Sequence, residues 1–192
     1  MLQQVEERPE KFSLWLDTRE KLGDLCTAMG RYDMAERSYG RLLEEDARQA
    51  LGRERVVKIY LSRGRVFEIQ GDYDSALKCY KDARNFLSGF DKDSLLVERL
   101  HVFNCIGWVY VCMGKYEKAM AISLEALRVI EGKSESIEHA MVYNTIGSAN
   151  YYKGNVGVAV EYHRRSLQIR ENLERIPEIT ASLNSLGAAH LA

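Results

Sequence analysis

Glycines recur along this chain at nearly constant intervals, and this regularity restricts the possible folds more than any other feature of the sequence. The spacings are 41, 43, 40 and 40 residues, between Gly23, Gly64, Gly107, Gly147 and Gly187. Each of the first four is followed seven residues later by another glycine and twelve residues later by an alanine. A period of this length indicates a structural unit that stacks on copies of itself, so we expect an array of repeats.

Each repeat has the pattern of two helices joined by a tight turn. The second glycine, in segments such as AMGRYD, IQGDYD and CMGKYE, predicts the left-handed residue that ends the first helix. The first glycine predicts the close approach of a neighbouring helix. In the third repeat, apolar residues share a face on each side of the turn: Leu100, Phe103, Ile106, Gly107 and Tyr110, then Ala119, Ile122, Ala126 and Val129. Since only two prolines occur and Val, Ile and Thr do not alternate with polar residues, nothing predicts a strand, and the expected fold class is all-α.

The charge balance and hydropathy of the chain exclude several classes of function. Its 192 residues contain 27 Lys and Arg against 28 Asp and Glu, so nucleic acid or an anionic membrane would meet no strongly basic surface. Apolar runs are far shorter than the ~20 residues of a membrane-spanning helix, and the start MLQQVEERPEKF lacks the apolar centre of a secretory signal. The sequence therefore predicts a cytoplasmic protein without a nucleic-acid or membrane partner.

No motif in the sequence predicts catalysis, a cofactor or a metal. The four cysteines, Cys26, Cys79, Cys105 and Cys112, form no C-x-x-C pair, and the four histidines show no metal-binding spacing. Gly132-Lys133-Ser134 resembles the end of a phosphate-binding loop, but Leu127 stands where that loop needs a glycine. We therefore expect reduced thiols and a protein that is not an enzyme.

The repeats resemble the tetratricopeptide repeat (TPR) family, whose consensus alternates bulky, small and aromatic positions. Repeat two matches it with Tyr60, Arg63, Gly64, Phe67, Ala76, Tyr80 and Ala83, and repeat three with Phe103, Ile106, Gly107, Tyr110, Ala119, Ser123 and Ala126. Repeats one and four depart from it at Arg19 and at Asn150, His163 and Ser166. The period of about 40 residues exceeds the usual ~34 of the family. This is similar to the long-repeat type of kinesin light chain-like adaptors and of TPR arrays in bacterial signalling ATPases, kinases and transcription activators.

The resemblance implies a right-handed superhelical solenoid of antiparallel helix pairs with about four and a half repeats. The expected repeats cover residues 16–56, 57–99, 100–139, 140–179 and a truncated 180–192, within a single domain 1–192. We expect the longer period to lengthen either the helices or the linkers. The chain is also expected to be a fragment of a longer protein.

In this family the first helices of successive repeats line a concave groove, which implies a set of candidate binding residues. They are Lys58, Arg65, His101, Asn104, Trp108, Asn144, Ser148, Tyr151, Tyr152 and Asn184. Repeat one adds the acidic Asp17, Glu20 and Asp24 to the groove, so its chemistry is expected to change from charged to neutral, aromatic and amide.

Two kinds of groove residue have alternative interpretations. Asn104, Asn144 and Asn184 recur one repeat apart, and they would either bind the backbone of an extended peptide or bond to neighbouring helices. Trp108, Tyr151 and Tyr152 would be either binding hot spots or core residues.

The resemblance implies a non-enzymatic module that binds a peptide or partner protein in its groove, as scaffold or sensor arm of a larger signalling protein. One alternative is self-association into a homodimer through the truncated last helix, where Leu183, Leu186 and Leu191 would lack a covering helix. The other is an effector-binding regulatory array, which would need a closed cavity with an apolar lining.

Overall fold

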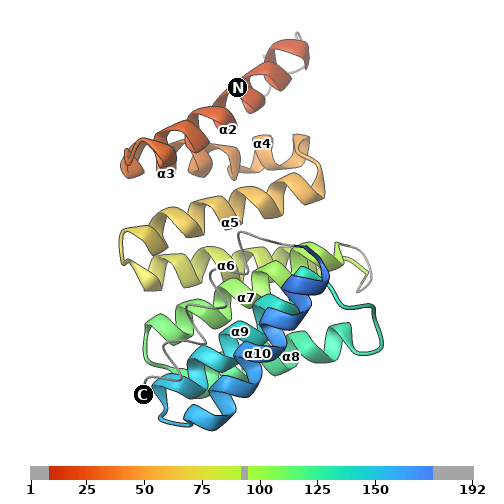
Figure 1. Cartoon of the computed structure of the whole chain (residues 1–192). Helices are drawn as coiled ribbons and strands as arrows, with labels where there is room; N and C mark the ends of the chain where they lie inside the picture. Colours follow the sequence, from red (N-terminus) through yellow and green to blue (C-terminus); the bar gives the residue numbers. More distant parts are fainter. Residues whose placement is uncertain (1–8, 92–94, 175–192) are drawn as a thin grey trace. The chain divides into compact units, whose positions relative to one another are not determined.

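The computed structural model describes residues 9–91 and 95–174, and these residues form helices and connecting turns without a strand (Figure 1). The helices are α2 (Pro9–Ala28), α3 (Tyr32–Leu42), α4 (Glu45–Ala50), α5 (Arg53–Ile69), α6 (Tyr73–Ser88), α7 (Leu96–Cys112), α8 (Tyr116–Ile130), α9 (Ile137–Tyr152) and α10 (Val156–Asn172). The predicted all-α fold class of helical repeats is confirmed. Asn184, Gly187 and the leucines proposed for self-association lie outside the described residues. No described helix combines the length and the apolar character needed to span a membrane.

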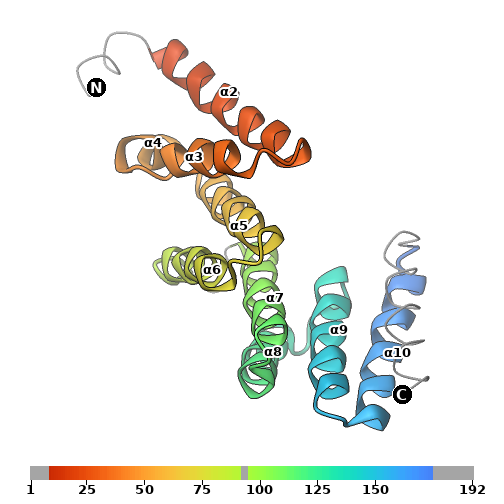
Figure 2. The ribbon, with the colours of Figure 1, turned by 90° about the vertical axis from the view of Figure 1, so that its left-hand side faces the viewer.

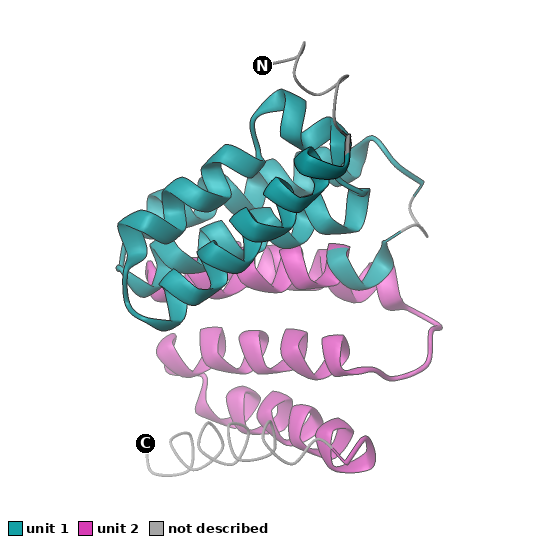
Figure 3. Cartoon of the chain, turned by 90° about the horizontal axis from the view of Figure 1, so that it is seen from above, with its two compact units in different colours: residues 1–98 teal, residues 99–192 magenta. Residues whose placement is uncertain are grey.

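The chain divides into two compact units, residues 1–98 and 99–192 (Figure 3). The division lies next to the predicted boundary between the second and third repeats, close to the start of α7. Unit 1 contains the helix pairs α2/α3 and α5/α6, and α3 packs on both α2 and α5. Unit 2 contains nearly all of α7, then α8, α9 and α10, with α9 and α10 side by side (Figure 2).

The extra length of the repeats appears partly in the first linker. There the six-residue helix α4 lies between α3 and α5, where a shorter repeat would have a turn. Within each pair, by contrast, the two long helices are separated by three residues only, as at 29–31 between α2 and α3. The additional residues of the longer period therefore lie in the linker between helix pairs, and the turns within pairs stay short.

The predicted left-handed glycines are found at all four turns within the helix pairs. Gly30, Gly71, Gly114 and Gly154 have φ of 70°, 76°, 69° and 84°. At each turn the next residue donates its backbone N–H to the carbonyl five residues earlier, for example Arg31 to Cys26 at 2.8 Å and Lys115 to Tyr110 at 2.8 Å. This bond satisfies a carbonyl that the end of the helix would leave free, which is why glycine recurs here.

The leading glycines lie where the second helix of a pair crosses the first. A Cβ atom on Gly23 would lie 2.6 Å from Cε1 of Tyr39, and one on Gly147 would lie 2.8 Å from Cε1 of His163. The ring of Tyr80 lies against Gly64 in the same way. The predicted close approach of a neighbouring helix is thus confirmed, and it depends on the absence of a side chain at these positions.

Candidate functional site

The first helices of the two pairs in unit 1 are joined by an ion-pair cluster. Arg55 of α5 donates from Nη2 to Oδ1 of Asp17 at 2.6 Å and from Nε to Oε2 of Glu20, both on α2. Partial burial disfavours the charged guanidinium, but the hydrogen bonds to Glu20 and Asp17 outweigh this and raise the pKa of Arg55. Two of the three acidic residues expected to line the groove in repeat one, Asp17 and Glu20, are therefore paired with a cation that the sequence analysis did not select, whereas Asp24 accepts a hydrogen bond from Oη of Tyr39 at 2.6 Å.

The two basic candidates on α5 are exposed and paired within their own helix. Lys58 Nζ lies 2.5 Å from Oε1 of Glu54, and Arg65 pairs with Glu68. Glu68 also accepts a hydrogen bond from Oη of Tyr80 at 3.0 Å. Since both cations have local partners, this part of the predicted groove presents compensated charge.

In unit 2 the two candidate asparagines bond to neighbouring helices. Thr145 Oγ1 on α9 donates to Asn104 Oδ1 on α7 at 2.8 Å. Asn144 Oδ1 lies 3.1 Å from Nδ1 of His163 on α10. The asparagines were expected either to bind a peptide backbone or to bond to neighbouring helices. In the structure the side-chain oxygen atom of each of the two bonds to a neighbouring helix. Ser148 is buried on α9, one turn after Asn144, and His101 is exposed on α7.

The aromatic candidates divide between core and surface. Trp108 is half-buried and packs against a small apolar cluster of Val111, Ala119 and Ala149. Tyr152 is 58% exposed. Trp108 therefore contributes to packing, whereas Tyr152 is available for contact.

Tyr152 belongs to an accessible group of three rings, called here the tyrosine cluster, formed by Tyr116, Tyr151 and Tyr152. Tyr152 stacks on Tyr116 with ring centroids 6.0 Å apart and planes at 12°. Tyr151 meets it edge to face at 5.3 Å and 68°. The sequence analysis did not select Tyr116. Its recurrence two residues after the turn glycine, at Tyr32, Tyr73 and Tyr116, was the signal that places a ring beside the end of a first helix.

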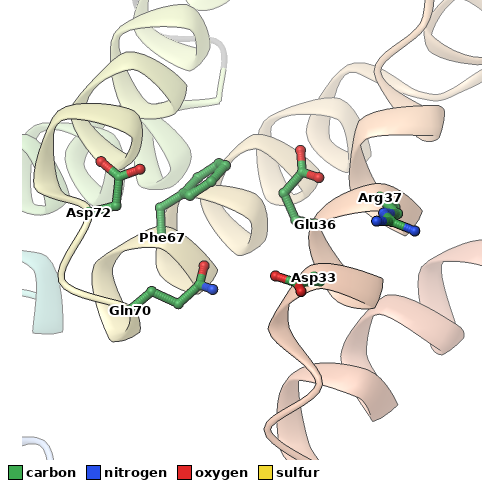
Figure 4. Close-up of a pocket in the computed structure, with 6 residues that line it drawn as sticks. All are labelled: Asp33, Glu36, Arg37, Phe67, Gln70 and Asp72. Atoms are coloured by element: carbon green, nitrogen blue, oxygen red, sulfur yellow. The ribbon is translucent and has the colours of Figure 1, made fainter.

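Unit 1 also contains a pocket of about 360 Å³ between the start of α3 and the end of α5. Asp33, Glu36 and Arg37 line it on the α3 side, and Phe67, Gln70 and Asp72 on the other (Figure 4). Apart from Phe67 this lining is polar or charged. It therefore differs from the closed apolar cavity that the effector-binding alternative requires.

Two groups around this pocket have internal roles. Arg63 donates from Nη2 to Oε1 of Glu36 at 2.5 Å, and its guanidinium lies 5.8 Å from the centre of the Phe67 ring. Asp72 accepts from the backbone N–H of Ser75 at 3.0 Å, and hydrogen bonding to the side chain of Ser75 and then to its backbone N–H lowers the pKa of Asp72. Asp72 thereby caps α6.

The described residues show no arrangement typical of a metal site, and the thiol of Cys79 is held in its unreactive form. No group of three or more His, Cys, Asp or Glu side chains within them could hold a metal ion. Burial raises the pKa of the Cys79 thiol to about 11, so this side chain stays protonated and unreactive at neutral pH. Gly132 has φ of 73° in the exposed turn after α8, which fits a helix-ending glycine better than a phosphate-binding loop.

Comparisons with known proteins agree with this geometry. Family models described as tetratricopeptide repeat match residues 15–88 and 139–174. A search of the curated proteins finds no significant match.

Solved structures match the chain over most of its length. BtubC (BKLC) from P. vanneervenii has a TM-score of 0.77 at 23% identity, covering 98% of this chain and 76% of that one. A Rap protein complexed with competence and sporulation factor has 0.73 at 16%, covering 90% of this chain and 47% of that one. A kinesin light chain-type protein of Podosopora anserina with nearly identical TPR-like repeats has 0.67 at 16%, covering 92% and 85%. The chain thus spans less than half the length of the Rap protein, and these similarities establish a shared fold.

Proposed function

The chain belongs to the tetratricopeptide repeat family, and from this premise we propose that it recognises a peptide or a peptide-like segment of a partner protein through α7 and α9. Repeats of this family generally act as non-catalytic interaction scaffolds. The proposed role is that of a scaffold or sensor arm of a cytoplasmic signalling protein. The contact surface consists of His101 and Asn104 on α7 and the tyrosine cluster, which lies at the end of α9 and the start of α8.

The observation that carries this proposal is the exposure of Tyr152 within the tyrosine cluster, whose other two rings are half-buried. Large aromatic side chains supply much of the binding energy at protein interfaces, because they bury a large area while losing little conformational freedom. Tyr152 is 58% exposed although it stacks on Tyr116, so the two rings are already ordered before a partner arrives. A partner that covers them therefore gains apolar burial at a small entropic cost.

The distribution of charge also favours unit 2 over unit 1 as the location of the binding surface. The predicted groove residues of unit 1 are held in ion pairs, such as Arg55 with Asp17 and Glu20. A partner on that surface would have to desolvate these charges or replace their bonds, which is costly. Between α7 and α9 the hydrogen bond from Thr145 to Asn104 is neutral, and the ion pair next in sequence to Tyr152 and Tyr116, between Lys153 and Glu117, has an exposed carboxylate. The similarity to a Rap protein complexed with competence and sporulation factor further supports a peptide-like ligand.

Selection from a random peptide display library against the chain tests this proposal. Selected peptides are then titrated against Tyr151→Ala and Tyr152→Ala variants, with Tyr73→Ala as the matched control, because Tyr73 is a half-buried tyrosine at the start of α6 in unit 1. We expect each cluster variant to weaken binding by about tenfold or more, and the control to bind as the unchanged chain does. Failure to select any peptide, or equal binding by all four proteins, would overturn the proposal.

A further inference from the structure

A second pocket lies in unit 2, where α8 ends and α9 begins. Its volume is about 470 Å³, within the ~300–1,000 Å³ typical of small-molecule sites. Leu124, Leu127 and Ile130 form its apolar lining on α8, and Tyr143 contributes from α9. None of its lining residues belongs to the predicted groove set, so it is separate from the surface proposed above.

A buried histidine supplies a polar group to this pocket. His139 is only 8% exposed and lines the pocket from the first turn of α9. Its Nδ1 accepts a hydrogen bond from the backbone N–H of Ser136 at 3.1 Å, which assigns the proton of the neutral ring to Nε2. Among the described residues no group accepts a hydrogen bond from Nε2. Although the side chain is nearly buried, its Nε2 atom keeps access to solvent, so a ligand in the pocket with an acceptor atom can bond to it.

The rim of the pocket carries charges of both signs. Arg128, Lys133, Glu131 and Glu135 line it and are exposed, and no ion pair joins Arg128, Glu131 or Glu135 to a described residue. A simple anion would leave the two carboxylates unmatched, and a simple cation would leave the guanidinium and the Nε2 donor unmatched. A ligand with a carboxylate, an ammonium group and an apolar side chain would match all of them.

We propose that this pocket binds a small apolar zwitterion of the amino-acid or dipeptide class with free ends. The ligand carboxylate accepts hydrogen bonds from Nε2 of His139 and from Arg128. Its ammonium group pairs with Glu131 or Glu135, and its side chains lie against Leu127 and Ile130. This site is independent of the proposed peptide surface, and either could fail without the other.

Calorimetric titration of the whole chain with leucine and with leucyl-leucine tests the proposal and distinguishes the free amino acid from the dipeptide. N-acetyl-leucyl-leucine lacks the ammonium group and leucyl-leucine amide lacks the carboxylate. We expect saturable binding of at least one unblocked probe, and each blocked dipeptide to bind about tenfold more weakly than leucyl-leucine or not at all. Absence of saturable binding at millimolar concentrations, or equal binding of the blocked and unblocked dipeptides, would overturn the proposal.

Two variants connect the binding to this pocket. Arg128→Gln should weaken leucyl-leucine about tenfold but leave leucyl-leucine amide unchanged, because the amide lacks the carboxylate that Arg128 binds. Arg164→Gln, an exposed arginine of α10 outside the pocket, is the control and should bind normally. His139→Phe should weaken binding similarly. If that variant unfolds because α9 loses its cap, the comparison of Arg128→Gln with Arg164→Gln tests the site by itself. Equal affinity of these two variants would place the ligand elsewhere and overturn the proposal.

Discussion

Units 1 and 2 have the same helix-pair repeat, but they join their helices with different chemistry. In unit 1, Arg55 connects α5 to two carboxylates of α2, and Arg63 connects it to Glu36 of α3. In unit 2, neutral bonds join helices from Thr145 to Asn104 and from Ser166 to the carbonyl of Ala140 at 2.7 Å, and an ion pair of Lys153 with Glu117 at 2.9 Å links the end of α9 to α8. The glycines and turns therefore set the repeat geometry, while the residues around them are free to make a charged or a neutral surface.

Adding one methyl group should have its most different effects at two leading glycines, Gly64 of unit 1, which a ring covers, and Gly107 of unit 2, which no ring covers. A Cβ on Gly64 would press into the ring of Tyr80, whereas one on Gly107 would meet Cγ2 of Thr145 at 3.1 Å and Oγ of Ser123 at 3.2 Å. We expect Gly64→Ala to lower the free energy of unfolding by about 1–3 kcal/mol through overpacking. For Gly107→Ala the smaller contacts are offset by the ~1 kcal/mol gain in helix propensity, giving little net change.

Urea unfolding followed by circular dichroism measures both variants. A Gly107→Ala chain that loses as much stability as Gly64→Ala would show that the ring is not what distinguishes the two repeats.

Replacing the arginine of the charged cluster should have a smaller effect that depends on salt. Arg55→Met removes the bonds to Asp17 and Glu20 and should lower the free energy of unfolding by about 1 kcal/mol. The loss is moderate because the Arg55 side chain is 33% exposed, and solvent weakens ion pairs at the surface. At about 1 M salt the difference from the unchanged chain should shrink, because screening weakens the pairs. Arg165→Met, which removes an exposed pair with Glu161 within one helix, serves as the control and should cost less than about 0.5 kcal/mol. A salt-independent loss at Arg55 would contradict the ion-pair account.

The smallest expected effect is on pH dependence, and it arises in unit 2. Burial, and then the charge of Arg170, lower the pKa of His163, so the unfolded chain takes up a proton at a higher pH than the folded chain. Stability is therefore full above the ordinary pKa of about 6.5 and falls as the pH drops below it, by at most about 0.7 kcal/mol between pH 7 and 6. In unit 1 the equivalent ring is Tyr39, whose pKa is raised to about 12, so it does not titrate in this range.

His163→Tyr isolates this contribution, because it places in repeat four the ring found in repeats one and two. Thermal melts of both proteins at pH 7 and 6 should show a smaller pH-dependent loss in the variant. An identical loss in both would assign the effect to other groups.

The sequence predicted the features that depend on local spacing. The turn glycines could be recognised because each turn is formed by a few adjacent residues, and the leading glycines because they recur once per repeat. The repeat period also assigned residues to the first helices, and so predicted a change from charged to neutral side chains along them. All of these follow from which face of a helix a residue occupies.

The sequence did not predict which partner a side chain would reach on another helix. Arg55 lies 38 residues from Asp17, and their pairing depends on how α2 and α5 are aligned within unit 1. The amide of Asn144 bonds to His163 because one of its rotamers meets the ring there, which the period alone does not specify. The proton on Nε2 of His139 follows from the hydrogen bond that Nδ1 accepts at the start of α9, and this bond depends on the loop before the helix.

The most direct test of the account uses the two tryptophans of the chain, because one lies in each unit. Trp15 is on α2 and Trp108 is on α7, so Trp15→Phe and Trp108→Phe proteins each report on one surface by fluorescence. On titration with a selected peptide, the account predicts a saturable change in the Trp15→Phe protein, which retains Trp108, and no change in the Trp108→Phe protein. A saturable change reported by Trp15, with none from Trp108, would place the partner on the charged surface of unit 1 and contradict the account.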